Sequence, residues 1–528
     1  MNFDFLIKGG LVFDGSQSDA CPRLADIGLK GDRIEAVGNL SVAYADKVIN
    51  AEGFCICPGF IDAHAHSEFT ILADGRAEGK ICQGITTEIN GNCGLSAAPL
   101  YGEALEQRLG EIKQLGIKER WSSFSEYFAF LNKKGIATNF LTLVGHGNIR
   151  ASAAGYADRR LTAEEKHRMN GFLKDALDSG AQGISTGLIY PPGLYSDTSE
   201  IIDLAKEAVK HNAGIYATHM RSEGDKLLEA LDEAIKIGID SKIRVHVSHL
   251  KTSGEKNWNK IQKVFEKIHN ARQKGLILTC DRYPYTAGGT DLDSVLPSWV
   301  YEGGRSEELK RLKNPKIHEQ IKKEIFHEHP DEDYWRNIII SYVGKKKNKW
   351  MEGKSLFEIG RLLNEASVEV LFKILIEEDL RVDAIFFSMN EENLKSILKL
   401  PYSVIGSDSS ARSFDGITAK GKPHPRGFGS FPRVLSRYVM EQGIISQEEA
   451  IYKMTGLPAK IFGIHRRGII KEDFFADITV FDFNSIKDKA SFDNPFHRPE
   501  GVHYVFVNGI PALWESRLTG ALSGKILD

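Results

Sequence analysis

The sequence has few cysteines, no long apolar run and no block of charges of one sign. Six cysteines scattered over 528 residues do not form the pattern of a disulfide framework. No stretch approaches the roughly 20 apolar residues that span a bilayer, and the N-terminal MNFDFLIKGG lacks the features of a signal peptide. The formal net charge of −3 argues against a nucleic-acid partner or an anionic membrane surface. We therefore expect a cytoplasmic protein with a small-molecule partner, and the oligomeric state is left open.

Both ends of the chain have the sequence pattern of short β-strands. Residues 1–57 and 465–528 alternate apolar and polar positions and carry turn-forming pairs such as Asp-Gly and Asn-Gly. The two segments are similar in character although they lie far apart in the sequence. We expect them to meet in one discontinuous small β-sandwich domain.

The middle of the chain, residues 58–464, alternates strand-like and helix-like segments. Helical apolar spacing is found at 162–179, 199–212, 225–237 and 258–274, and the first of these opens with a Thr-x-x-Glu capping signal. Eight strands are expected: one running into Ile61 and seven beginning at Ile85, Asn139, Gly180, Gly214, Ile243, Leu276 and Tyr402. This order predicts an α/β fold, a (β/α)8 TIM-type barrel. Residues 290–400 exceed what one crossover needs and predict an insertion, which we interpret as a lid over the barrel mouth.

Metal-ligand side chains occur where the predicted strands end. In GFIDAHAH, His64 and His66 are two residues apart and therefore point to the same side of a strand. Alone, this pair is as well explained by two structural histidines; Cys93 alone is a small buried hydrophobe, and Asp408 alone is a turn or cap residue. The convergence of six such residues on one rim is harder to explain by packing, and imidazole, thiolate and carboxylate donors together suit Zn(II). The candidate metal ligands are His64, His66, Cys93, His219, His249 and Asp408.

Other histidines and cysteines have different interpretations. His246 has strand parity opposite to that of His249, so we expect it to face outward as a structural residue. His146 ends a predicted strand and is either a supporting residue of the site or a packing residue. Cys55 and Cys57 lack a second cysteine pair, so packing is favoured over metal binding.

Several motifs occur in an order typical of one enzyme family. They are GFIDAHAH, GNCG, ATHMR, SHLK, YPYTAG, GSD and HPRGFGSFPRVL, followed by the passage back to the β domain at residues 454–482. In these motifs the chain resembles the N-acyl-D-amino-acid deacylases, or D-aminoacylases, of the amidohydrolase superfamily. Cys93 is the discriminating feature, because hydantoinases, dihydroorotases and ureases resemble one another in using a carbamylated lysine as the metal bridge.

The resemblance implies roles for individual residues. A tight zinc site would be held by Cys93, His219 and His249, and a weaker second site would be lined by His64, His66 and Asp408; whether one ion or two is bound stays open. Asp408 would act as general base and then as general acid in hydrolysis of the amide bond of an N-acyl-D-amino acid. The clamp for the substrate α-carboxylate would be Lys251, Tyr283 and Arg426.

The chain departs from the family where Gly289 stands in place of an expected serine, and where the insertion is longer than in the relatives. Preference for D over L substrates follows only from the resemblance. Competing readings are a cyclic-amide hydrolase of the hydantoinase type, a deaminase, and a non-catalytic barrel scaffold. A scaffold typically loses its metal ligands, whereas all six are present here.

Overall fold

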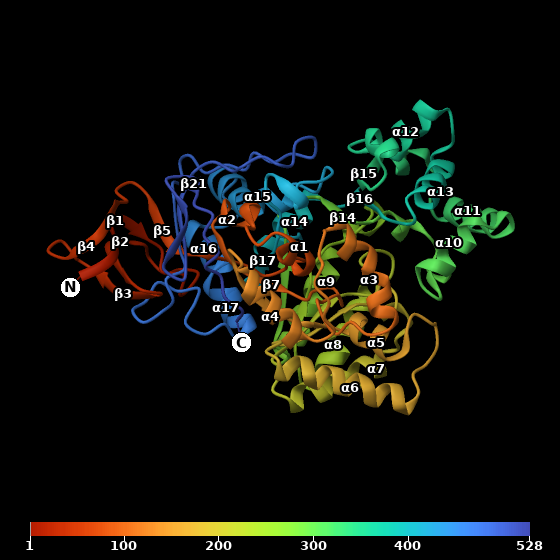
Figure 1. Ribbon diagram of the computed structural model, residues 1–528, viewed down its shortest axis with the longest axis horizontal. Helices are drawn as coiled ribbons and strands as arrows, with labels where there is room; N and C mark the ends of the chain where they lie inside the picture. Colours follow the sequence, from red (N-terminus) through yellow and green to blue (C-terminus); the bar gives the residue numbers. More distant parts are fainter. Residues whose placement is uncertain (1, 528) are drawn as a thin grey trace.

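A computed structural model describes residues 2–527 (Figure 1). The fold is of TIM-barrel type, with mixed α/β content and several sheets. At its centre are two sets of parallel strands, and within each set neighbouring strands follow the order of the sequence. The first set, in the order β6-β7-β8, is β6 (Phe60–Asp62), β7 (Ile85–Asn90) and β8 (Asn139–Thr142). The second set is β9 (Val144–Gly145), β10 (Gly183–Gly187), β11 (Ile215–His219), β12 (Arg244–Val247), β13 (Leu278–Arg282) and β17 (Ser403–Ile405).

Contacts join the two sets at both edges. β8 and β9 are separated by Leu143 alone, and the backbone N–H of Ala63 donates to the carbonyl oxygen of Ile405 at 3.1 Å. Most residues of these strands are buried on both faces, as expected where helices cover a parallel sheet. The predicted strand from Asn139 is shorter than expected, since His146 begins a helix.

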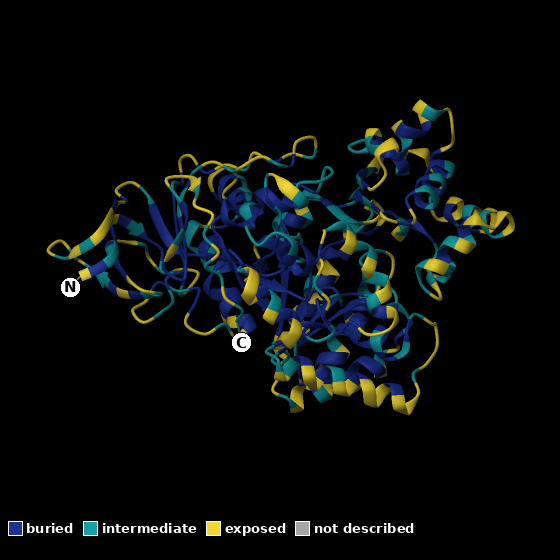
Figure 2. Ribbon diagram, in the orientation of Figure 1, coloured by how far each residue is buried: buried dark blue, intermediate teal, exposed yellow. Residues whose placement is uncertain are grey.

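Helices surround the parallel strands, and their outer faces are exposed while the centre is buried (Figure 2). The predicted capping signal is confirmed, because Thr162 accepts the N–H of Glu165 at 3.2 Å and Glu165 in turn accepts the N–H of Thr162. The helices of this layer are α1 (Glu68–Ala73), α2 (Glu78–Ile81), α3 (Glu103–Gln114), α4 (Phe124–Lys134), α5 (His146–Ala154), α6 (Ala163–Asp178), α7 (Thr198–Lys210), α8 (Leu227–Ser241), α9 (Ile261–Gln273), α14 (Glu391–Leu398), α15 (Arg426–Arg433), α16 (Gln447–Met454) and α17 (Gly456–Phe462).

A separate sheet joins the two ends of the chain, and red N-terminal strands lie beside blue C-terminal segments in Figure 1. β5 pairs in parallel with β1 and antiparallel with β18, so the termini share one hydrogen-bonded sheet. Within residues 2–527 its strands are β1 (Asn2–Val12), β2 (Arg23–Lys30), β3 (Arg33–Gly38), β4 (Tyr44–Asn50), β5 (Cys55–Pro58), β18 (Ile478–Phe481), β19 (Val502–Val507), β20 (Ile510–Trp514) and β21 (Arg517–Leu518). Cys55 and Cys57 are buried in a hydrophobic cluster, which confirms that they pack.

The segment predicted as an insertion projects from the rest of the molecule (Figure 1). It has its own hydrophobic cluster, which includes Trp335, Leu371 and Val382. Near its C-terminal end, α14 packs against β13 and β17. Strand β14 (Ala287–Asp291) runs into the segment and pairs antiparallel with β16 (Val382–Phe387), which also pairs with β15 (Ile338–Val343). The segment also contains the helices α10 (Arg305–Lys313), α11 (Pro315–Glu328), α12 (Leu356–Leu363) and α13 (Ser367–Glu377). No helix within residues 2–527 is long and apolar enough to cross a membrane.

Candidate metal centre and active site

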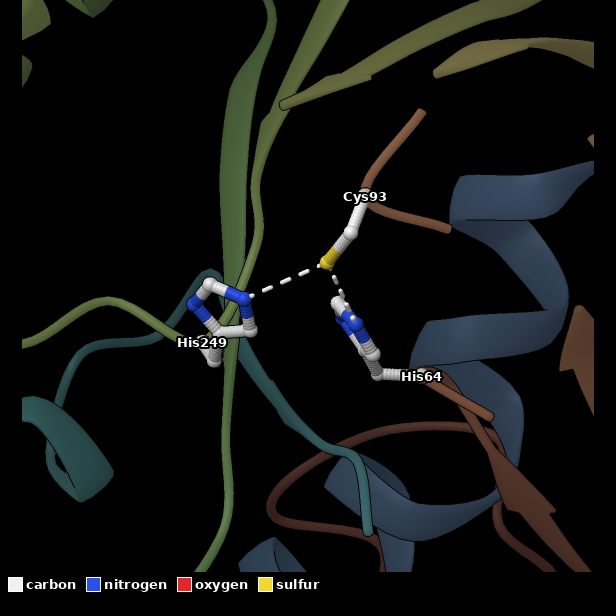
Figure 3. Close-up of side chains that lie close together, drawn as sticks. All are labelled: His64, Cys93 and His249. Carbon is white, nitrogen blue, oxygen red and sulfur yellow. Dashed lines mark hydrogen bonds between the residues drawn. The ribbon is translucent and has the colours of Figure 1, made fainter. Parts of the chain in front are cut away.

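Cys93 lies between two histidines just beyond the ends of the parallel strands (Figure 3). Its Sγ is 3.4 Å from His64 Nε2 and 3.4 Å from His249 Nε2. Burial alone would raise the pKa of this thiol, but the neighbouring His64 and His249 outweigh burial and hold it well below its usual value. A thiolate is the form that binds zinc, so the three side chains form a preorganised set of soft and borderline donors.

A second group is built around Asp408, which follows β17. Asp408 Oδ1 lies 3.3 Å from His66 Nε2 and 3.6 Å from His64 Nε2. Because His64 contacts both Cys93 and Asp408, the two groups share it. Asp408 Oδ2 forms an ion pair with Arg426 Nη1 at 2.8 Å. Burial raises the pKa of Asp408, but Arg426 and the histidines outweigh burial and keep this carboxyl well below its usual pKa.

His219 completes the centre from β11. Its ring centroid is 4.5 Å from that of His249, and its Nε2 is buried with no hydrogen-bond partner among the described residues. An orphaned ring nitrogen that faces other donors fits a metal ligand. The grouping nevertheless differs from the predicted one: His219 clusters with His249 and Glu223, whereas His64 takes the place beside Cys93 and His249.

The three predicted clamp residues border this centre from different sides. Lys251 Nζ lies 2.7 Å from His249 Nδ1 and pairs with Glu223. Tyr283 is fully buried, and the Arg426 guanidinium lies 4.6 Å above its ring. Contacts therefore connect all nine residues that the sequence singled out.

The expectation that His246 faces outward is wrong. His246 is fully buried, and its Nε2 lies 3.0 Å from Asp281 Oδ2, which also lies 3.1 Å from His64 Nδ1. The parity argument fails because β12 ends at Val247 and His249 has a φ of 36°. Alternation along a strand cannot be carried across such a turn. His146, for which the sequence allows a supporting or a packing role, has its Nε2 2.9 Å from Glu200 Oε1 and supports α7 rather than the centre.

Sequence reasoning missed three residues that contact the centre. Glu223 accepts from Lys251 and lies 3.0 Å from His249 Nδ1; its signal is its place four residues after His219. Asp281 orients His64, and its signal is a carboxylate inside the apolar run LILTCDRY. Tyr190 packs its ring against His219 and lies 3.2 Å from Thr290 Oγ1, with no signal in the sequence.

Comparison with known proteins shows to which protein family the chain belongs. The amidohydrolase family signature matches residues 47–283 and 347–512, and the chain belongs to the amidohydrolase family. Within it, the chain is 35% identical to the D-aminoacylase of Alcaligenes xylosoxydans xylosoxydans, over 99% of this chain and 97% of that one. It is 33% identical to the N-acyl-D-aspartate deacylase of the same organism, over 98% of this chain and 93% of the relative.

A solved structure gives the same result. The N-acyl-D-glutamate deacylase of Bordetella bronchiseptica, complexed with zinc and a phosphonate mimic of the tetrahedral intermediate, superposes with a TM-score of 0.84 at 30% identity, and both chains are covered completely. The predicted resemblance to the N-acyl-D-amino-acid deacylases is thereby confirmed.

Proposed function

We propose that this protein is a zinc-dependent hydrolase that cleaves the amide bond of N-acyl-D-amino acids and releases a carboxylate and a free D-amino acid. The observation that carries the proposal is the Cys93 thiol between His64 and His249, beside the Asp408–Arg426 pair. The full-length similarity to deacylases of D-amino acids supports it.

The proposed metal ligands are those predicted from the sequence, with one tight zinc site and a weaker second one. The donor set fits zinc, since one group combines the Cys93 sulfur with two imidazoles and a second, which shares His64, combines two imidazoles with the Asp408 carboxylate. When bound, zinc supplies Lewis acidity and lowers the pKa of water toward 7. The proposed ligands are His64, His66, Cys93, His219, His249 and Asp408.

Asp408 is the proposed acid–base residue. As a carboxylate it can accept a proton from the attacking water and then deliver that proton to the departing amine nitrogen. Arg426 Nη1, 2.8 Å from Asp408 Oδ2, keeps the carboxylate ionised and is also a proposed substrate ligand. With Lys251 and Tyr283 it would bind the α-carboxylate, since a guanidinium fork matches that group.

The architecture proposed around this site is a closed eight-stranded barrel at residues 58–464 with a β-sandwich domain formed by 1–57 and 465–528. Residues 290–400 are proposed to form a lid. This role is supported by the contact of Thr290 with Tyr190 at 3.2 Å. Next to Thr290 in β14, Gly289 accepts a hydrogen bond from Arg426 Nη2 at 3.3 Å.

The test is amine release from a panel of N-acetyl-D- and N-acetyl-L-amino acids by zinc-reconstituted enzyme. We expect release from D substrates only, and its loss in Cys93→Ala. Turnover of hydantoins or dihydrouracil with no release from linear amides would instead favour the cyclic-amide reading. If the zinc-loaded protein releases no product from any of these substrates, the deacylase function is refuted.

A further inference from the structure

A fully buried lysine lies beside β6 and β7, outside the set of residues discussed so far. Lys80 belongs to the short helix α2, and its side chain has no exposed surface. Its Nζ lies 2.6 Å from Asp62 Oδ2 and 3.2 Å from Glu88 Oε2. Burial opposes its charge, but these two carboxylates outweigh burial and raise the pKa of Lys80. The lysine is therefore a cation held between β6 and β7.

The same amine holds both neighbours of Asp408. Lys80 Nζ donates to Ser407 Oγ at 2.9 Å and to the carbonyl oxygen of Ser409 at 2.9 Å. Asp62 strengthens this attachment, because it accepts the Ser407 N–H at 2.7 Å and the Ser407 hydroxyl at 2.6 Å. The loop that carries Asp408 is thus fastened on each side of that residue by one buried network.

Asp408 needs such support because its backbone is strained. Its φ is 49°, in the left-handed region that aspartate adopts only at a cost. Its own N–H donates to the His64 carbonyl at 2.8 Å, so the loop is bonded to the segment after β6 that carries the histidines. If the bonds to Ser407 and Ser409 were lost, the loop could relax and move the carboxylate away from His66 and Arg426.

We propose that Lys80 is a positioning residue that sets the place of the Asp408 carboxylate for catalysis. The inference rests on the proposed acid–base role of Asp408. Lys80 makes no hydrogen bond to any of the nine predicted site residues, so it acts through the backbone and side chain of the loop. The competing explanation is a core ion pair that contributes stability alone.

A second buried lysine, near the start of β17, provides a matched control. Lys453 is also buried, with 1% of its side chain exposed, and its Nζ donates to the carbonyl oxygens of Leu400 and Ser403. Ser403 begins β17, whereas Asp408 follows the end of that strand. Lys453→Met therefore removes a buried lysine of α16 that bonds to the start of β17, without releasing the Asp408 loop.

The experiment measures kcat, KM, zinc content and melting temperature for Lys80→Met, Ser407→Ala and Lys453→Met, in the parent enzyme and in Asp408→Asn. We expect Lys80→Met to lower kcat about 10- to 100-fold, since small misplacements of reacting groups have effects of this size. KM should stay within about twofold and tight zinc should be retained. Ser407→Ala should lower kcat about 3- to 10-fold, and Lys453→Met less than twofold. In the Asp408→Asn background the effect of Lys80→Met should disappear.

The inference is overturned if Lys80→Met lowers kcat no more than Lys453→Met, or by the same factor with and without the Asp408 carboxylate. If Lys80→Met does not fold, an unchanged kcat in Ser407→Ala overturns it. A crystal structure of the Lys80→Met or Ser407→Ala protein gives a readout independent of activity: the loop should shift at Asp408, and an unmoved loop refutes the inference. Normal turnover in Asp408→Asn would instead refute the proposed role of Asp408.

Discussion

Asp281 provides a quantitative test of how the centre is held together. Its Oδ2 lies 3.1 Å from His64 Nδ1 and 3.0 Å from His246 Nε2, and all three side chains are fully buried. A carboxylate that accepts the second ring N–H of a metal-binding histidine fixes the tautomer and the ring orientation. Asp281→Asn keeps the shape but removes the charge. Hydrogen bonds to charged groups contribute roughly 1.5–3 kcal/mol, about twice as much as neutral ones, so the His64 bond should lose about half of this, roughly 0.8–1.5 kcal/mol.

That loss corresponds to about a 4- to 12-fold increase in the zinc concentration that half-activates the apoenzyme. The assay is amine release during zinc titration of metal-free protein. Thr279→Val is the matched control, because Thr279 Oγ1 lies 2.8 Å from His246 Nδ1 and the residue does not touch His64; its half-activating concentration should change less than twofold. If Asp281→Asn also stays within twofold of the parent, His64 is not oriented by Asp281 for the activating metal and the reasoning is refuted.

Three further substitutions test the catalytic base, the clamp and a buried acid. Asp408→Asn should lower kcat about 100-fold or more while tight zinc is retained by the other donors; near-normal turnover would contradict the base role. Arg426→Ala should raise KM about 10- to 100-fold, because charge-assisted bonds to a carboxylate are lost, with Arg426→Lys intermediate; an unchanged KM would count against the clamp. Burial and then Asp293 raise the pKa of Glu308 to about 9, whereas an unfolded glutamate titrates near 4.3. The folded state thus binds more protons between these values, and stability falls as pH rises through that window. Glu308→Gln should raise the melting temperature at pH 9 but not at pH 4, and equal shifts at both would contradict this.

The position of most proposed ligands could be predicted because strand ends are visible in the sequence. His219 closes the run GIYATH and is the last residue of β11, and Ile85 begins both the predicted and the observed β7. The parallel strands bring their carboxyl ends to one rim. The apolar pattern of each strand and the rule that parallel strands end at one rim therefore predict that side chains more than 300 residues apart in the sequence lie close together.

The supporting residues could not be found in this way. Lys80 and Ser407 are 327 residues apart and form a bond at the end of a short helix that carries no periodic signal. Glu223 lies in a loop after β11, where neither spacing nor alternation fixes the direction of a side chain. The error at His246 has the same origin, because parity is defined only while the strand continues.

Backbone conformation explains why the sequence does not show how the proposed ligands are oriented toward one another. Cys93, His249 and Asp408 have φ values of 53°, 36° and 49°, so three proposed ligands adopt a left-handed conformation just beyond a strand. Such a turn changes the direction of the side chain, and the residue type does not predict it, since glycine is the usual residue in the left-handed conformation. The conformations persist only where surrounding bonds over-determine them, as the Lys80 network does around Asp408. The strands thus bring the proposed ligands to one rim, while buried polar groups outside the centre hold the turns that carry them.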